Sequence, residues 1–190
     1  MRHLSVIALL ALACITGCAA TTVKTNWKDP AVTSISFKKV VVVVLNSTPG
    51  QRRAQEDVIV EQIKSTTAVA SYSLVPDDQL KDVNKARQTI AAAGFDGAIV
   101  VHLLGKKEVT TYNPGTSWND PWNYGYGTQS YAYTDTFIKA EISLYSITTG
   151  KLIWSGMSES INPSDDRAFA KQVAAATAKE LRKQGLLPPE

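Results

Sequence analysis

The chain contains two cysteines, Cys14 and Cys18, and both lie in an apolar stretch near its start. A disulfide between residues four positions apart would close a very small loop and constrain little. A zinc site needs further cysteine or histidine ligands, and His102 is the only such residue after the first few positions. The sequence therefore predicts neither a disulfide nor a metal site, and it suggests no cofactor.

The segment around the cysteines has the pattern of a secretory signal. A short basic start is followed by an apolar run of about a dozen residues, which is too short to span a membrane. Residues 15–18, ITGC, resemble the bacterial lipobox, in which the cysteine thiol takes a diacylglycerol and the chain is cut before it. We predict a signal peptide over residues 1–17 and lipidation of Cys18. Two alternatives remain open, a competing site at Cys14 and an ordinary cleaved signal with two incidental cysteines.

The residue after the lipobox cysteine indicates a destination. Ala19 stands where an Asp would resemble an inner-membrane retention signal, so we expect a lipid-anchored protein of the outer membrane that faces the periplasm. Residues 18–35 are predicted to be a polar tether, and residues 36–190 a single domain. The net charge of +3 is small and its basic residues are scattered, so no nucleic-acid partner is expected.

Candidate catalytic groups are few. His102 lies in a predicted strand, where a core or edge histidine is the expected role, and no Gly-x-Ser-x-Gly elbow exposes a serine nucleophile. The acid pairs at 77–78 and 165–166 each precede a predicted helix, where carboxylates cap free amides. Glu56 with Arg52 or Arg53 is interpreted as a surface ion pair. The chain is predicted not to be an enzyme.

Residues 112–133 form the most distinctive segment. This segment contains two of the four tryptophans and five of the seven tyrosines, with Asp120 as its only charged residue. Long connections in compact domains are usually functional or disordered, and rigid aromatics mixed with Gly, Ser and Asn are typical of binding loops. A lid over the sheet or a disordered loop is the alternative. The predicted ligand-binding residues are Tyr112, Trp118, Trp122, Tyr124, Tyr126 and Tyr131.

The elements that must position this segment follow from hydrophobic periodicity. Residues 37–46 and 97–105 are β-branched runs typical of buried strands, and residues 133–147 alternate as a strand with one wet side. A short strand is predicted at 71–76, and Lys106 to Tyr112 are expected to extend the strand at 97–105 past a bend at Gly105. Helices are predicted over 51–65, from 77–78 to 93, and after 165, with Gly94 and Gly185 ending the last two. The order β-α-β-α-β-β-β-α predicts an α/β (α+β) fold. We expect one mixed sheet of about five strands, three helices mainly on one face, and a final antiparallel meander.

These motifs together resemble an uncharacterised family of bacterial envelope lipoproteins. The matching features are the lipobox, Trp27 before Pro30, the strand at 37–45, and the stretches GFDGAIVV and SLYSITTGKLIWSG. More distantly, the pattern is similar to the periplasmic domains of the curli-secretion lipoprotein and of the Tol-system translocation protein. The resemblance implies an envelope location and an α/β sandwich, and it implies no reaction.

Two functional hypotheses follow. The first is a non-enzymatic outer-membrane lipoprotein that binds or supports an envelope component, which could be a glycan, a peptide or a protein, through the aromatic segment. The second is a self-assembling structural subunit of an envelope complex, which would form a homo-oligomer through an exposed strand edge. A hydrolase of an unrecognised kind is a remote third alternative.

Overall fold

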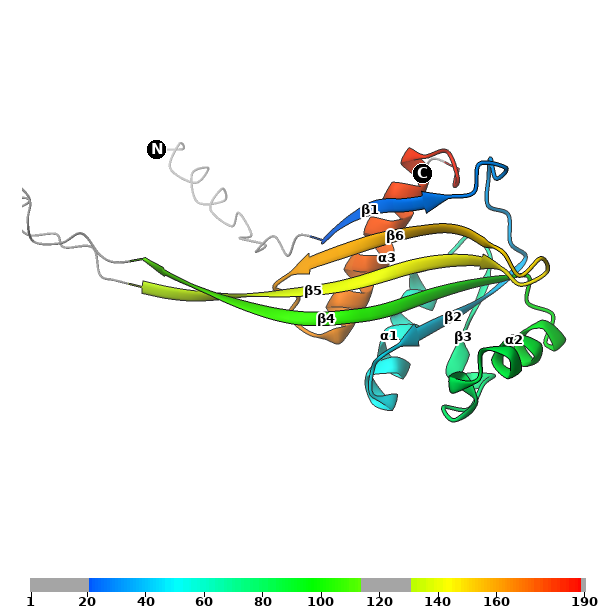
Figure 1. Cartoon of the computed structure of the whole chain (residues 1–190), viewed down its shortest axis with the longest axis horizontal. Coiled ribbons are helices and arrows are strands. Elements are labelled where there is room, and N and C mark those ends of the chain that lie inside the picture. Colours follow the sequence, from blue (N-terminus) through cyan, green and yellow to red (C-terminus); the bar gives the residue numbers. More distant parts are fainter. Residues whose placement is uncertain (1–20, 114–130, 189–190) are drawn as a thin grey trace, which may run out of the picture.

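The computed structural model describes residues 21–113 and 131–188, in which helices pack on a mixed β-sheet in an α+β arrangement. A single sheet has six strands in the order β1-β6-β5-β4-β2-β3 (Figure 1). Its strands are β1 (Thr21–Lys28), β2 (Lys39–Leu45), β3 (Thr67–Ala70), β4 (Gly97–Asn113), β5 (Tyr131–Ser146) and β6 (Leu152–Ile161). The predicted fold class is confirmed, with one strand more than expected.

The sheet combines two halves of different direction. Strand β2 pairs in parallel with β3 and β4, while β4, β5, β6 and β1 pair antiparallel in turn. Parallel neighbours need a crossover, and the helices α1 (Pro49–Gln62) and α2 (Val83–Ala92) lie in the connections that supply it. The predicted antiparallel meander is therefore confirmed at β4–β5–β6.

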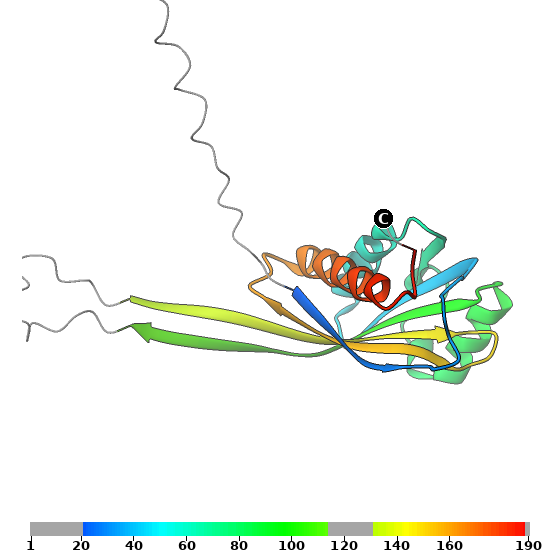
Figure 2. The same ribbon diagram turned by 90° about the horizontal axis from the view of Figure 1, so that it is seen from above.

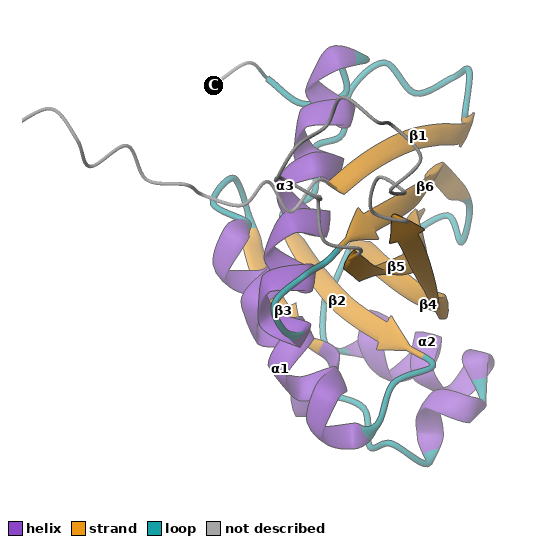
Figure 3. Cartoon of the chain, turned by 90° about the vertical axis from the view of Figure 1, so that its left-hand side faces the viewer, coloured by secondary structure: helices purple, strands orange, loops and turns teal. Residues whose placement is uncertain are grey.

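The helices divide between the two faces of the sheet. Helices α1 and α3 (Asp166–Lys183) lie together on one face, whereas α2 lies on the other, beside β2 and β4 (Figures 2 and 3). Strand β2 shows why both faces need cover, because its side chains alternate between two apolar clusters. Val42 and Val44 pack toward α1 and α3, and Val41 and Val43 pack toward α2. A continuous apolar run is what a strand buried on both faces requires.

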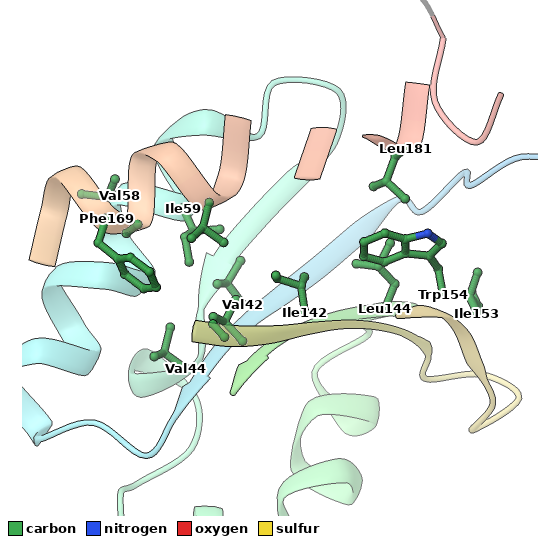
Figure 4. Packing of buried hydrophobic residues seen from close by; sticks show 14 of the residues in the cluster. Val42, Val44, Val58, Ile59, Ile142, Leu144, Ile153, Trp154, Phe169 and Leu181 are labelled. Carbon is green, nitrogen blue, oxygen red and sulfur yellow. The ribbon is translucent and has the colours of Figure 1, made fainter. Parts of the chain in front are cut away.

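The larger cluster lies between the sheet and the pair α1 and α3. Figure 4 shows Val42, Ile142 and Leu144 from the strands on the same side as Ile59 of α1 and Leu181 of α3. Trp154 of β6 is completely buried beside Leu144. Among the described residues, no helix lies over the opposite face of β5 and β6, because α2 lies beside β2 and β4.

Strand β1 differs from the predicted tether over residues 18–35. Residues 21–28 pair antiparallel with β6 in the register Thr21↔Ser160 to Lys28↔Trp154, with an irregularity between Thr25 and Trp27. The strand alternates half-buried and exposed residues, and its hydroxyls at Thr21 and Thr25 bond to α3. A polar edge strand has too few apolar residues for periodicity to reveal it.

The region between β3 and α2 also departs from the prediction. The expected strand at 71–76 begins earlier, at Thr67, and gives way to a short 3-10 helix, η2 (Ser71–Ser73). A second one, η3 (Gln79–Lys81), precedes α2, whose N-cap is Asp82 rather than Asp77 or Asp78. The Asp82 carboxylate accepts hydrogen bonds from the amides of Asn84 and Lys85.

Other predicted helix boundaries are confirmed. Asp165 is the N-cap of α3 and accepts from the Ala168 amide at 2.7 Å. Gly94 and Gly185 follow α2 and α3 with positive φ angles of 78° and 70°, the conformation that ends a helix with little strain for glycine. Among the described residues, no helix has the length and apolarity needed to cross a bilayer.

Candidate functional site

Strands β4 and β5 extend beyond the rest of the sheet as a two-stranded ribbon (Figures 1 and 2). Among the described residues, 105–113 pair with no strand other than β5, and 131–136 with none other than β4. We call these two segments the ribbon. Its end leads into residues 114–130, which lie outside the described part of the chain. The two described ends of the aromatic segment, residues 112–113 and 131–133, therefore lie at the end of the ribbon.

The ribbon begins at a bulge. One extra residue, Leu104, separates Leu103↔Ala140 from Gly105↔Lys139 in the pairing of β4 with β5, and Gly105 has a φ of 153°. Bulges bend a strand and increase its twist, and glycine adopts positive φ angles readily. The predicted bend at Gly105 and the continuation of the strand beyond it are both confirmed.

Asn162, the residue after β6, fastens the base of the ribbon. Its side-chain oxygen accepts from the Thr136 amide at 2.7 Å, and its own amide donates to the Thr136 carbonyl at 2.8 Å. The Asn162 side-chain NH2 donates to the Asp135 carboxylate at 2.7 Å. Asn162 has a φ of 50°, a conformation that asparagine tolerates better than most residues. These bonds fix the direction in which the ribbon leaves the domain.

The two faces of the ribbon carry different side chains. The face that we call the tyrosine face contains Asn113↔Tyr131 and Thr111↔Tyr133, with Val109 next along β4. The opposite face contains Tyr112↔Ala132 and Thr110↔Thr134, and the two threonine hydroxyls hydrogen-bond at 2.9 Å. Side chains alternate across a strand, so this register decides which aromatics can act together.

The tyrosines are exposed to solvent. Tyr112, Tyr131 and Tyr133 are 65%, 58% and 46% accessible, respectively. The rings of Tyr131 and Tyr133 stack with centroids 6.4 Å apart, and the Asn113 side-chain NH2 donates to the Tyr131 hydroxyl at 3.1 Å. Exposed aromatic groups are costly to leave in water and commonly mark interaction sites. Trp and Tyr also dominate the binding energy at many interfaces.

A shallow depression of about 440 Å³ lies where the tyrosine face meets the sheet. It is lined by Leu104, Gly105, Lys106, Lys107, Val109, Phe137, Lys139 and Glu159. The Lys139 ammonium lies 3.1 Å from the Glu159 carboxylate. Lysines therefore outnumber acids around an apolar floor, which suits a partner with apolar and acidic groups.

One carboxylate on the ribbon has a shifted pKa. A hydrogen bond from Lys106 lowers the pKa of Glu108, and the charge of the same ammonium adds to the effect. The two groups are 2.8 Å apart, and both side chains are more than half exposed. Such an exposed pair contributes little to stability. Among the described residues that line the depression, Lys107 is then the cation without an ion pair.

The structure places only part of the predicted site. Tyr112 and Tyr131 lie in strands and on opposite faces of the ribbon, so they do not form one surface. Tyr133, which was not among the predicted ligand-binding residues, is the stacking partner of Tyr131. The two-residue spacing of Tyr131 and Tyr133 is the signal that could have found it. The remaining predicted residues, Cys18, Trp118, Trp122, Tyr124 and Tyr126, lie outside the described residues.

His102 is half-buried in β4, where it is paired with Leu45 at the end of β2 and with Glu141 of β5. Its Nε2 atom is 2.7 Å from the Asn46 side-chain nitrogen, and Asn46 also donates to the Leu103 carbonyl. Asn46 follows β2 with a φ of 60°. Within residues 21–113 and 131–188, no group of three His, Cys, Asp or Glu side chains is placed to hold a metal ion.

The predicted surface ion pair on α1 is wrong, because the pair is buried. Arg52 is 4% exposed and Glu56 is inaccessible, with Arg52 Nε 2.9 Å from Glu56 Oε1. Glu56 also accepts from the Val44 amide, the Ser71 hydroxyl and the Tyr72 amide, at 3.0, 2.7 and 3.1 Å. None of these three donors lies in α1, because Val44 belongs to β2 and Ser71 and Tyr72 belong to η2. The sequence of the helix alone therefore does not reveal them.

Arg52 is satisfied as fully as Glu56. Its guanidinium donates to Ser71 at 2.7 Å and pairs with Asp77, which is therefore an ion-pair partner and not the predicted helix cap. A buried charge pair is tolerated only when its remaining hydrogen-bonding groups are satisfied. Each of the three guanidinium nitrogens of Arg52 and both carboxylate oxygens of Glu56 have a partner, so the cluster fastens α1 to β2 and to η2.

The comparisons with known proteins concern the fold. No family model matches the chain, and no curated protein sequence matches it. Among solved structures, the PelC dodecamer from Paraburkholderia phytofirmans is similar, with 12% identity, a TM-score of 0.46 and coverage of 88% of this chain and 99% of that chain. Lipoprotein GNA1162 from Neisseria meningitidis is similar with 13% identity, a TM-score of 0.41 and coverage of 76% and 98%, respectively. At these identities the likeness concerns the fold alone.

Proposed function

We propose that this protein is a non-enzymatic lipoprotein of the outer membrane that binds an envelope component through the ribbon and the aromatic segment at its end. The observation that supports this most strongly is the exposed tyrosine face. Tyr131 and Tyr133 are exposed and stack on one another, on a ribbon that no helix of the described residues covers. The anchor is proposed from the lipobox at residues 15–18, and Cys18 would carry it.

The ribbon offers two modes of contact. Its outer edges have backbone amides and carbonyls that no described strand pairs, and an extended peptide can bind such an edge by adding a strand. The tyrosine rings can stack on the apolar face of a sugar or on an aromatic side chain. Both modes suit a polymer or a protein better than a small metabolite, because the binding groups lie along an arm and not around an enclosed cavity.

The second candidate is a self-assembling structural subunit. The sheet is open, and β1 is an edge strand of eight residues with only β6 beside it. Exposed edges readily pair with another chain. This observation favours assembly through β1, at the opposite edge of the sheet from β3, and such assembly would not need the ribbon.

Capture from intact envelopes after chemical cross-linking distinguishes the two functions. In the test variant, a short Gly-containing turn replaces residues 113–130, and a second variant carries Trp118→Ala with Trp122→Ala. Binding through the arm predicts that both variants stay folded and anchored but lose the captured component. If both variants still capture the envelope component, the ribbon and the aromatic segment do not bind it. An oligomer that persists in sedimentation of the deletion variant would favour assembly through the sheet edge.

A further inference from the structure

A cavity of about 720 Å³ lies on the face of the sheet that α1 and α3 cover. Ile142 of β5 lines it, and Figure 4 shows this side chain directed toward the side of the sheet on which the helices lie. The helices contribute Ile59 of α1 and the small side chains of Ala174 and Ala178 of α3. Protein interiors are otherwise close-packed, so a space of this size beside the main apolar cluster needs an explanation.

One buried polar group of the cavity has no partner. Thr177 lines the cavity and is 8% exposed, and its hydroxyl has no hydrogen-bond partner among the described residues. Val173, Thr177 and Leu181 follow one another at four-residue spacing, so they share one face of α3, and the first and last are buried and apolar. Valine has the shape of threonine without the hydroxyl, so packing alone does not require threonine here. A buried hydroxyl without a partner is unfavourable unless a ligand supplies one.

The group that pairs with this hydroxyl should be uncharged. Burial of a charge against a single neutral hydroxyl is costly, whereas a neutral oxygen needs one hydrogen bond. Two cationic residues also line the cavity, but Lys64 is exposed to water and Arg182 has an interaction of its own in the chain. None of the described lining residues is Asp or Glu, so the cavity offers no carboxylate to a cationic ligand.

The volume restricts the ligand to one long chain. With about 30 Å³ for each water-sized group, a glycerol ester of one 16-carbon acid needs about 690 Å³, and an ester of two such acids about 1,200 Å³. The cavity of about 720 Å³ therefore accommodates the first and excludes the second. Its size and largely apolar lining are those of a small-molecule site.

We propose that this cavity binds a neutral lipid with one acyl chain, a monoacylglycerol. The apolar residues of α1, α3 and the sheet surround the hydrocarbon chain, and the Thr177 hydroxyl donates to the ester carbonyl. This site is separate from the tyrosine face, because α1 and α3 cover it while the ribbon projects from the sheet. It adds lipid binding to the proposed function and does not depend on that function.

Native mass spectrometry of the full chain, purified in the bulky detergent digitonin and titrated with monopalmitoylglycerol, tests the proposal. We expect one monopalmitoylglycerol per chain and no adduct of dipalmitoylglycerol, which has two chains. Palmitate has the same chain with a charged end, and we expect it to bind at least tenfold more weakly at pH 8.

Two variants connect the binding to this cavity. Thr177→Val should weaken the binding of monopalmitoylglycerol about fivefold, as expected for loss of one neutral hydrogen bond, without lowering the melting temperature of the free protein. A purely structural threonine would show the reverse pattern. Ala174→Phe fills the cavity from α3 and should weaken binding at least tenfold. Its matched control is Ala175→Phe, because Ala175 is exposed on the same helix and does not line the cavity.

Several outcomes would overturn the proposal. Absence of a monopalmitoylglycerol adduct on folded protein, equal or tighter binding of palmitate, unchanged binding by Thr177→Val, or equal binding by the Ala174→Phe and Ala175→Phe variants would each do so. Thermal melting followed by circular dichroism checks folding, and Ala178→Leu replaces Ala174→Phe if that variant does not fold. If the adduct forms only on Cys18→Ser protein, the occupant in wild type is the chain's own acyl group and the proposal is wrong.

Discussion

Tyr131 and Tyr133 stack on the same face of β5, with ring centroids 6.4 Å apart and ring planes inclined by 27°. Both rings are about half exposed, and they belong to a part of β5 that no helix in the described part of the chain covers. Two neighbouring residues on β4, Thr111 and Asn113, face them across the ribbon, and Asn113 bonds to the Tyr131 hydroxyl. The pair is therefore positioned by the ribbon's register, and its exposed surface is available to a partner.

Removal of the buried arginine should destabilise the fold strongly. Arg52→Ala leaves the inaccessible Glu56 carboxylate without its cation, and loss of one partner of a buried pair costs about 3–5 kcal/mol. Arg53→Ala is the control, because Arg53 is exposed and lies over the Tyr72 ring at 5.7 Å, a contact that contributes about 0.5–1 kcal/mol. Urea unfolding measures the loss of unfolding free energy in both variants. Equal losses for the two variants would contradict the structural role of the pair.

The substitution Gly156→Ala, which adds a methyl group, should also destabilise the domain. A Cβ at Gly156 would lie 2.4 Å from the Trp154 ring and 3.1 Å from the Lys24 carbonyl, and the ring is too deeply buried to move away. Overpacking of this kind costs about 1–3 kcal/mol. Gly50→Ala lies in the first turn of α1, where no atom is near the added methyl group, and should leave the stability of the domain unchanged or raise it slightly. Thermal melting that ranks the two variants in the opposite order would refute this packing.

The carboxylate of Asp96 should make stability depend on pH. Burial acts to raise its pKa, but the amides of Lys38 and Lys39 donate to it at 2.8 and 2.9 Å, and the net effect lowers the pKa. Because the folded pKa lies below the unfolded one, the stabilisation is complete above about pH 4 and is lost as the pH falls through the folded value.

Asp96→Asn provides the test of that dependence. The free energy of unfolding of the variant should be about 1 kcal/mol lower than that of wild type at pH 7, because one hydrogen bond to a backbone amide is weakened or lost. The difference from wild type should shrink as the pH falls from 5 toward 2, in urea unfolding at each pH. Asp78→Asn is the control at an exposed residue that does not cap a helix with its side chain. A difference that stays constant across this range would rule out the proposed linkage.

Lipidation is predicted to depend on Cys18 alone. Cys18→Ser should abolish incorporation of a labelled fatty acid during growth and release the protein from the membrane fraction. Cys14→Ser should leave both unchanged, because only Cys18 completes the ITGC motif. Label retained by the Cys18→Ser protein would disprove the assignment of the anchor.

The sequence alone predicts those parts of the fold that are determined by residues close together in the chain. The β-branched run at 40–44 predicts a doubly buried strand, the alternation after 133 predicts β5, and the glycines at 94 and 185 predict helix ends. Strand β1 was missed because its residues are mostly polar, and it is stabilised by pairing with β6, which lies far away in the sequence. The burial of Arg52 and Glu56 was missed for the same reason, since their partners come from β2 and from the segment after β3.

The candidate site was predictable in composition but not in geometry. The density of aromatic residues over 112–133 marks this part of the chain, whereas the opposite placement of Tyr112 and Tyr131 follows from the register of β4 with β5. A cavity of about 720 Å³ on the face of the sheet that α1 and α3 cover has no sequence signal at all. Its lining residues come from seven separate segments of the chain and read as ordinary core positions in each.

Site-specific photo-cross-linking in living cells tests the central claim most directly. A photoreactive benzoylphenylalanine is placed at Tyr133 on the tyrosine face, and in a separate strain at Lys171, an exposed residue of α3. Binding through the ribbon predicts a discrete cross-linked product from position 133, lost when Tyr131→Ser is added, and none from position 171. Absence of a product at position 133 in folded, anchored protein, or the same product from both positions, would contradict it.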